Sequence, residues 1–142
     1  MALALASDGV LYHSATGQVL LQHRSPDAHL NPDRWGLFGG GEEAIDAGDP
    51  VATWCRELHE ELGIAVGSAH VRRVGERLWR DGTRETLFYC PWPTLDTAFD
   101  VTEAQAVAWF SFDAALALPN LAPGARYLLP ELRELLARGG GA

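Results

Sequence analysis

Three glutamates, Glu57, Glu60 and Glu61, are spaced so that an α-helix would carry all of them on one face. Residues at positions i, i+3 and i+4 point the same way, because each residue turns the helix by about 100° and raises it by about 1.5 Å. Carboxylates this close repel one another, and a hard divalent cation relieves that repulsion. Because Mg²⁺ commonly bridges carboxylates to phosphates, the spacing indicates a site for a metal-bound diphosphate.

The flanking residues favour this metal site over a solvated acidic face, which is the usual role of a run of charges. Residues 35–38 are apolar and typical of a strand, and they lead into Gly39-Gly40-Gly41, where a backbone can approach a ligand closely. Asp49-Pro50 has the form of a capped helix start, and Gly63 that of a helix end. We expect a strand, a glycine loop, an acidic loop and a carboxylate helix, in that order. The opposite helix face is apolar, with Val51, Cys55, Leu58 and Leu62.

Residues 56–64, Arg-Glu-Leu-His-Glu-Glu-Leu-Gly-Ile, resemble the second half of the Nudix hydrolase signature at every specified position. That signature runs Gly, five residues, Glu, seven residues, Arg-Glu-hydrophobic-x-Glu-Glu-x-Gly-hydrophobic. The first half departs from it, because Gly48 stands eight residues before Arg56 and the nearest acidic residues are Asp46 and Asp49. With Gly40 as the signature glycine, the step to Asp49 is about three residues longer than the pattern. A loop tolerates such a change, whereas a helical register does not.

The resemblance implies a catalytic metal site built on this helix. Glu57, Glu60 and Glu61 correspond to the family's metal ligands, with Mg²⁺ as the expected ion and Mn²⁺ as the alternative, and we expect Glu57 to double as the general base. The backbone carbonyl of Gly40 or Gly41 is a further candidate ligand. A tight turn is the simpler account of these glycines, and both accounts can hold.

Two residues beside the carboxylates have candidate supporting roles. Arg56 could contact a phosphate directly, but its planar fork of donors favours a role in holding the glycine loop and the carboxylates in place. In the Nudix family the first signature glutamate supports the loop and helix around the metals. Asp49 is a candidate for that role, although capping the helix is its simpler role.

A base or a fourth ligand often comes from outside the signature in this family, on a loop before a late strand. Glu103, which precedes the apolar segment 107–110, occupies the corresponding place and is our candidate. Glu85 is the rival. For either residue, a plain surface role is an equal alternative.

Candidate substrate-binding residues are polar or aromatic side chains that could contact phosphate or stack on a base. They are Arg24, Arg34, Trp35, Arg84, Asn120 and Tyr127. Singly, an exposed arginine is more often solvated and a tryptophan more often packed. Asn120 lies before the last expected helix, where relatives that act on oxidised guanine nucleotides place a base-reading asparagine. Helix capping or turn formation is the simpler account of this residue.

The remaining pattern predicts strands and helices in alternation. Residues 3–12 and 18–23 read as strands joined at Thr16-Gly17, and residues 71–80 and 83–92 as strands joined at Asp81-Gly82. A strand over 107–112, a short helix over 113–118 and a last helix over 125–137 follow. Together with the resemblance, this predicts a single α/β domain over residues 1–142. We expect a Nudix-type α/β/α sandwich with a mixed central sheet and a flexible tail over 139–142.

Composition and charge narrow the partners. The chain has 142 residues, 47% of them hydrophobic and 21% charged, which is ordinary for one globular domain. A net charge of −8 argues against binding to nucleic acid polymers or anionic membranes, but it allows a small phosphorylated molecule bound as its metal complex. The two cysteines, Cys55 and Cys90, are expected to be free thiols, and no segment predicts a membrane span or a signal peptide. We expect a cytoplasmic monomer or homodimer.

Three functions agree with these residues. The first is metal-dependent hydrolysis of the diphosphate bond in a nucleoside diphosphate linked to another moiety, such as a nucleotide sugar or a dinucleotide. The second is pyrophosphohydrolysis of a nucleoside triphosphate, including oxidised dGTP, which would sanitise the nucleotide pool. The third is a non-catalytic Nudix module that senses a nucleotide. Because the three glutamates and Arg56 are all present, we favour an enzyme over a sensor.

Overall fold

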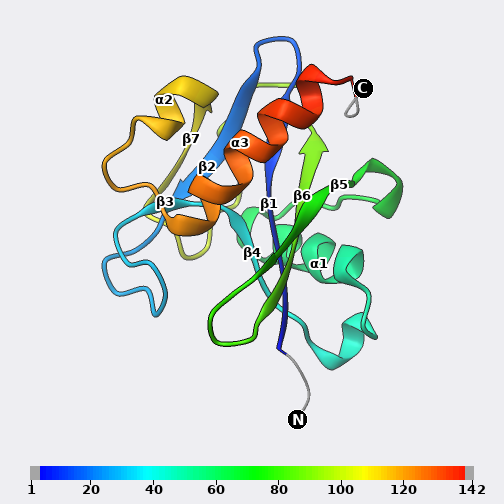
Figure 1. Cartoon of the computed structure of the whole chain (residues 1–142). Helices are drawn as coiled ribbons and strands as arrows, with labels where there is room; N and C mark the ends of the chain where they lie inside the picture. The colour runs from blue at the N-terminus through cyan, green and yellow to red at the C-terminus, as the bar shows by residue number, and fades with distance from the viewer. Residues whose placement is uncertain (1–3, 140–142) are drawn as a thin grey trace.

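One mixed sheet of seven strands forms the centre of the part of the chain that the structure describes, residues 4–139, with helices on both of its faces (Figure 1). The structure is a computed structural model. The strands are β1 Leu5–His13, β2 Gln18–His23, β3 Trp35–Gly36, β4 Phe38–Gly41, β5 Arg72–Leu78, β6 Arg84–Pro91 and β7 Ala106–Ser111. The helices are α1 Pro50–Leu62, α2 Phe112–Leu116 and α3 Pro123–Ala137, with short 3-10 helices η1 Ala44–Asp46 and η2 Ser68–His70.

Strand β1 organises the sheet, whose main order is β3-β2-β1-β6-β5. β1 pairs in parallel with β6, whereas β2 and β4 pair with it antiparallel. β4 pairs with residues Ala6–Gly9 of β1, and β2 pairs with its residues Leu11–His13. The expected mixed sheet and α/β/α sandwich are confirmed.

Successive residues of a strand belong to two different hydrophobic cores, because side chains alternate between the faces of a sheet. Val10 and Leu87 are buried in the core under α3. Leu11 and Phe88, one residue further along each strand, are buried in the core under α1. The two helices therefore lie on opposite faces, and a residue's place in its strand decides which helix it meets.

The two predicted hairpins are confirmed. His13 accepts the backbone N–H groups of Thr16 and Gly17 at the first turn, where Gly17 has a φ of 72°. At the second turn Gly82 has a φ of 89° and donates to the carbonyl of Trp79. These positive φ values explain why glycine follows a polar residue at each turn.

Some element boundaries were wrong. The segment 35–38 is not one strand, because the chain changes partner at Leu37: β3 pairs with β2, and β4 pairs with β1. Gly39–Gly41 was expected to be a loop but belongs to β4. Phe112 is helical because Ser111 ends β7 and caps α2, its hydroxyl accepting from the N–H of Ala114 at 3.1 Å.

The buried face of α1 also differs from the expectation. Trp54, which was not assigned to the apolar face, is fully buried, and its indole N–H donates to the carbonyl of Phe38 at 2.9 Å. Leu58 and Leu62 are buried as expected, whereas Cys55 is only half-buried. The i, i+4, i+8 spacing of Trp54, Leu58 and Leu62 defines the packed face. Cys55 and Cys90 are both free, as expected.

Two other expectations concern the ends of the chain and the membrane. The predicted tail over 139–142 falls, beyond Gly139, outside the described residues. Among residues 4–139, no helix is both long enough and apolar enough to cross a membrane.

Candidate active site

Helix α1 presents the carboxylates, and its sequence fixes both ends. Asp49 caps the start by accepting the N–H of Val51 at 3.0 Å, and Pro50 stands at the first helical position. Gly63 ends the helix with a φ of 72°, a conformation that other residues adopt only at a cost. The buried Trp54–Leu62 face anchors the helix, so its opposite face is free to carry polar side chains.

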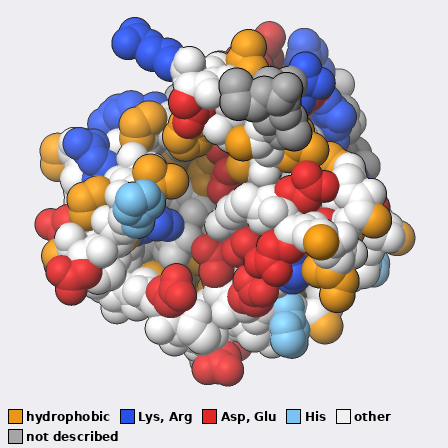
Figure 2. Space-filling model, turned by 90° about the horizontal axis from the view of Figure 1, so that it is seen from below, with side chains coloured by type: hydrophobic (Ala, Val, Ile, Leu, Met, Phe, Trp, Pro, Cys, Tyr) orange, Lys and Arg blue, Asp and Glu red, His pale blue; other side chains and the backbone are white. Residues whose placement is uncertain are grey.

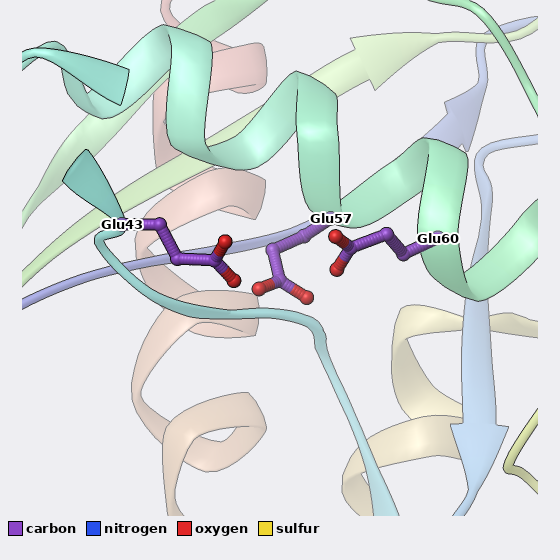
Figure 3. A group of neighbouring side chains, drawn as sticks. All are labelled: Glu43, Glu57 and Glu60. Atoms are coloured by element: carbon purple, nitrogen blue, oxygen red, sulfur yellow. The ribbon is translucent and has the colours of Figure 1, made fainter. Parts of the chain in front are cut away.

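Two of the predicted ligands, Glu57 and Glu60, meet a third carboxylate that the sequence did not indicate. Glu43, which immediately precedes η1, contributes it, and one oxygen from each of the three lies within 4.8 Å of the others. Figure 3 shows the three carboxylates pointing toward one another, two from α1 and one from the segment after β4. Neighbouring carboxylate oxygens of this kind are the donors that hard divalent cations prefer.

Arg56 lies at the centre of this cluster. Its Nη1 is 3.1 Å from carboxylate oxygens of Glu43, Glu57 and Glu60. Its Nη2 donates to the carbonyl of Gly41 at 2.9 Å, which ties the helix to β4. These contacts are the ones expected of a residue that positions the carboxylates. A direct part of Arg56 in catalysis stays a prediction.

Asp46 is the residue that orients Arg56, and sequence reasoning missed it. It is 4% exposed, and its carboxylate accepts from Arg56 Nε and Nη2 at 3.0 Å each, from Thr53 Oγ1 at 2.9 Å and from the N–H of Glu43 at 2.9 Å. The hydrogen bonds from Arg56 hold the pKa of Asp46 well below its usual range. Asp46 thus makes the loop and helix contacts considered for Asp49, whose side chain caps α1. Only its position, ten residues before Arg56, was visible in the sequence.

Glu61, the third predicted ligand, lies apart from the Glu43–Glu57–Glu60 group. Its carboxylate accepts the N–H of Gly39 at 2.9 Å and the amide of Gln22 at 3.3 Å. Burial raises the pKa of Glu61 to about 8, and the charge of Glu57 adds to the rise, against the lowering effect of these hydrogen bonds. Burial likewise raises the pKa of Glu57. Both raised pKa values indicate that these carboxylates lie where too little solvent reaches them to stabilise their negative charge.

Gly40 allows the close approach of β4 to α1. A Cβ built on Gly40 would lie 2.6 Å from Glu57 Oε1, so a larger residue would push the Glu57 carboxylate out of its present position. The glycine therefore lets the Glu57 carboxylate lie against the strand. Coordination of a metal by the Gly40 carbonyl stays a prediction.

Three cavities meet beside this cluster. The first, of ≈ 380 Å³, is bounded by Glu57, Glu60, Glu61 and Glu103, and we call it the acidic cavity. The second, of ≈ 440 Å³, lies under α3 and is mainly apolar. The third, of ≈ 450 Å³, is polar and extends along residues 25–29. Arg24 lines all three, so the cavities are neighbours around this residue.

The molecular surface is hollowed on one face (Figure 2). Figure 2 shows a hollow with acidic side chains gathered along one rim and basic and histidine side chains on the opposite side. Glu103 is exposed and faces the acidic cavity from the loop before β7, which is fixed by a hydrogen bond from Thr102 Oγ1 to the carbonyl of Glu60 at 3.1 Å. Its rival, Glu85, lies instead in the cavity under α3.

The other predicted substrate-binding residues lie away from these three cavities. Arg84 pairs with Glu76 at 3.8 Å, and Trp35 stacks on His23 with ring centroids 4.9 Å apart. Arg34 is exposed and lines none of the three cavities among the described residues.

Asn120 and Tyr127 also make contacts that do not involve the site. Asn120 donates to the carbonyl of Asp33 at 3.2 Å, and α3 is capped at Ala122, so capping by Asn120 is wrong. Tyr127 lies 40% exposed, with the Arg77 guanidinium 5.5 Å from its ring centroid. Of this group only Arg24 reaches the acidic cavity, and substrate binding by the others stays a prediction.

Comparisons with known proteins agree with the geometry. The NUDIX domain family model matches residues 4–132. The NUDIX domain of Shewanella oneidensis NrtR, complexed with ADP ribose, has a TM-score of 0.75 and 22% identity over 96% of this chain and 90% of that one. The solution structure of the E. coli ORF135 protein has a TM-score of 0.72 and 27% identity over 97% and 94%. MutT protein from Methanosarcina mazei Go1 has a TM-score of 0.69 and 20% identity over 92% and 94%. A sequence search of curated proteins gives no match.

The chain therefore belongs to the Nudix family, as residues 56–64 predicted. It is a Nudix pyrophosphohydrolase, an enzyme of the class that acts on nucleoside diphosphate derivatives. Nudix enzymes generally use divalent metal ions, and the donor set present fits such an ion. The single guanidinium of Arg56 contacts four carboxylates and cannot balance their charge, so the cluster retains a surplus of negative charge.

Proposed function

We propose that the protein hydrolyses, with Mg²⁺, the diphosphate bond of a nucleoside diphosphate linked to a second moiety, such as a nucleotide sugar or a dinucleotide. The observation that carries this proposal is the presence of two further cavities next to the acidic one, each sharing lining residues with it. Arg24 stands where the three meet, as a guanidinium that binds a diphosphate would. A nucleoside would occupy the apolar cavity under α3, and the second moiety would occupy the polar cavity along residues 25–29.

The NrtR domain supports this assignment. That domain was solved in complex with ADP ribose, a ligand with a diphosphate between two larger groups, and its fold covers nearly all of this chain. A nucleoside triphosphate has a large group at one end only. It would leave the polar cavity empty.

The chemistry would be attack of water at phosphorus. Glu57, Glu60 and Glu43 would hold the metal ion, which supplies charge neutralisation at the diphosphate and lowers the pKa of a bound water. Glu57 would take the proton of the attacking water, a role suited to a carboxylate whose pKa is raised. Arg24 would hold the diphosphate against the cluster. Glu61 and Glu103 would complete the ligands on the far side of the acidic cavity.

A phosphate-release screen tests the proposal, because the two enzymatic readings differ in their products. Cleavage of a nucleotide sugar or dinucleotide gives two phosphomonoesters, from which alkaline phosphatase releases phosphate. Cleavage of a nucleoside triphosphate to its monophosphate gives pyrophosphate, from which inorganic pyrophosphatase releases phosphate. We expect a signal from the phosphatase-coupled reaction with nucleotide sugars or dinucleotides and Mg²⁺, and a weaker signal from the pyrophosphatase-coupled reaction with triphosphates.

Two other outcomes would contradict it. Faster turnover of triphosphates would assign the enzyme to the nucleotide pool. No turnover of any substrate, together with thermal stabilisation by nucleotides, would make the protein a sensor.

A further inference from the structure

A second pair of acidic side chains lies on the opposite face of the sheet from α1, at the floor of the cavity under α3. Asp8 of β1 and Glu85 of β6 both line this cavity. Their strands are parallel neighbours, with Ala6 opposite Glu85 and Asp8 opposite Leu87, so both side chains point to the α3 face. Glu85, the rival candidate for the base or fourth ligand, thus lies away from the acidic cavity, which it does not line.

Asp8 and Glu85 are diagonal neighbours on these two paired strands, and both side chains line the cavity. Burial, followed by the neighbouring carboxyl of Glu85, raises the pKa of Asp8 well above its usual range. A carboxyl group has two oxygens and donates at most one proton. The pair therefore offers more acceptor oxygens than donors to anything that enters the cavity.

Glu85 is held rigidly by its neighbours. It is 2% exposed, and its Oε1 accepts the indole N–H of Trp79 at 3.2 Å and lies 3.2 Å from Arg77 Nε. The Arg77 guanidinium is in turn placed between two aromatic rings, 4.9 Å from the centroid of Trp79 and 5.5 Å from that of Tyr127. Oε2 of Glu85 is the oxygen without these partners. A fixed acceptor of this kind is suited to recognition rather than to solvent contact.

The walls of the cavity suit a flat aromatic group. Leu30, Leu37 and Ala125 are among its apolar lining residues, and Gly36 and Gly124 leave room beside them. Its volume of ≈ 440 Å³ falls in the range of small-ligand pockets, roughly 300–1,000 Å³. The cavity adjoins the acidic one through Gly39 and Arg24, which line both. A nucleobase in the cavity would thus keep its phosphates near α1.

We propose that Asp8 and Glu85 select a nucleobase that carries an exocyclic amino group, guanine, adenine or cytosine, over hypoxanthine and uracil. An amino group donates to the acceptor oxygens of the pair. At the same place hypoxanthine lacks the amino group of guanine, and uracil presents a carbonyl where cytosine has an amine. A carbonyl facing these oxygens would leave two buried acceptors opposed. The inference deepens the proposed function and rests on it only in taking the ligand to be a nucleotide.

Binding of nucleoside monophosphates to the whole protein tests the inference without requiring turnover. Isothermal titration calorimetry in Mg²⁺ would compare two matched pairs, GMP with IMP and CMP with UMP. We expect the amino-bearing member of each pair to bind at least about tenfold more tightly, because one well-placed pair of base contacts discriminates by about 1–3 kcal/mol. Equal affinities within both pairs, or no binding of any monophosphate, would overturn the proposal.

A pair of variants assigns the preference to the carboxyl groups. Asp8→Asn replaces an acceptor oxygen with an amide donor and should reduce each preference about tenfold, to near equality. Glu131→Gln removes the same charge from the exposed side of α3 and should keep the wild-type preferences. An unchanged preference in a folded Asp8→Asn protein would overturn the assignment. If Asp8→Asn does not fold, the wild-type comparison of the two pairs still decides the proposal.

Turnover of the glucose esters of GDP, CDP and UDP separates this inference from the proposed function. If all three esters are cleaved equally fast and the monophosphates bind equally, the base selection is wrong and the diphosphate hydrolase stands. If the monophosphates show the preference but only triphosphates are cleaved, the base selection stands and the proposed substrate class is wrong.

Discussion

The two acidic regions of the molecule, the cluster on α1 and the Asp8–Glu85 pair under α3, are assembled in different ways. Arg56, Glu57 and Glu60 lie within about one helical turn, so their sequence spacing alone brings them together. Asp8 and Glu85 lie far apart in the sequence and meet only because β1 and β6 are parallel neighbours. A local pattern can thus predict the first region, whereas only the topology of the sheet reveals the second.

The two regions also balance their negative charge differently. The cluster on α1 is held by the guanidinium of Arg56 and retains surplus charge, which suits a divalent cation. In the pair under α3, Glu85 faces the Arg77 guanidinium, and burial raises the pKa of Asp8 and so favours its neutral form, which suits a neutral base. The contrast indicates that one region serves the reaction and the other the choice of substrate.

The largest expected effect is on the reaction. Glu60→Gln keeps the shape of the side chain but removes a ligand charge, so we expect kcat to fall by at least about 10²-fold with nearly unchanged folding. The preference for GMP over IMP should be retained, because Asp8 and Glu85 are untouched. Steady-state kinetics, thermal unfolding and calorimetry on one preparation check this. Wild-type turnover in the variant would refute the metal site, and a lost base preference would show that the regions are not separate.

A smaller loss is expected where a residue acts on the cluster through Arg56. Asp46→Asn removes the negative charge that orients the guanidinium, and we expect kcat/KM to fall about tenfold, the range for residues that support metal ligands. Because the pKa of Asp46 is lowered by folding, its charge stabilises the native protein above its ordinary pKa, and this is lost as the pH falls through the lowered value. The difference in melting temperature between wild type and variant should therefore be largest near neutral pH and vanish in strong acid. Wild-type kinetics in the variant would exclude this role.

The sequence was informative where the evidence was local. Capping by Asp49, the stop at Gly63 and the carboxylate face of α1 each depend on residues within a few positions, and the structure has the helix where they predict it. The fold could also be predicted from local signals, because strands and tight turns each have a recognisable residue pattern. Trp54 shows the limit, since the packed face of α1 was misjudged by one residue.

The residues that were missed depend on contacts distant in sequence or on an irregular loop. Glu43 and Asp46 meet Arg56 because the 3-10 turn η1 folds back on the helix, and Ala47 takes a left-handed φ of 53° to allow it. The chemical type of a residue was not enough to predict its place at the substrate site. Arg84 and Trp35 are chemically suitable, yet they contact Glu76 and His23 away from the three cavities. A substrate site formed by several strands cannot be read from spacing along one of them.

Glu61 offers a test of how the α1 region relieves buried charge. Its pKa is raised to about 8 in the folded protein, so between its ordinary value of 4.5 and about 8 the folded state keeps a proton that the unfolded state releases. Without metal, stability should therefore fall as the pH rises through this window. Glu61→Gln stays neutral, and at pH 8 with EDTA we expect it to be more stable than wild type, on the order of 1–2 kcal/mol.

Thermal unfolding at about pH 4 and about pH 8, with EDTA or Mg²⁺, measures this difference. The two proteins should converge at the lower pH, and Mg²⁺ should stabilise wild type more than the variant. If Mg²⁺ leaves the difference at pH 8 unchanged, Glu61 relieves its charge with a proton and not with the metal ion, and the contrast between the two regions fails at this residue.

The smallest expected effect concerns the start of the helix that carries the cluster. Asp49 accepts the N–H of Val51, whereas Asp46 is the aspartate that contacts Arg56, so Asp49→Ala should lower the free energy of unfolding by about 1 kcal/mol, the usual worth of a helix cap. Turnover should be unchanged at temperatures where the variant is folded, because Asp46 still orients Arg56. Denaturant unfolding and steady-state kinetics measure the two quantities. Unchanged stability with lost turnover would mean that Asp49 belongs to the chemistry of α1 rather than to its folding, and that Asp46 and Asp49 share the supporting role.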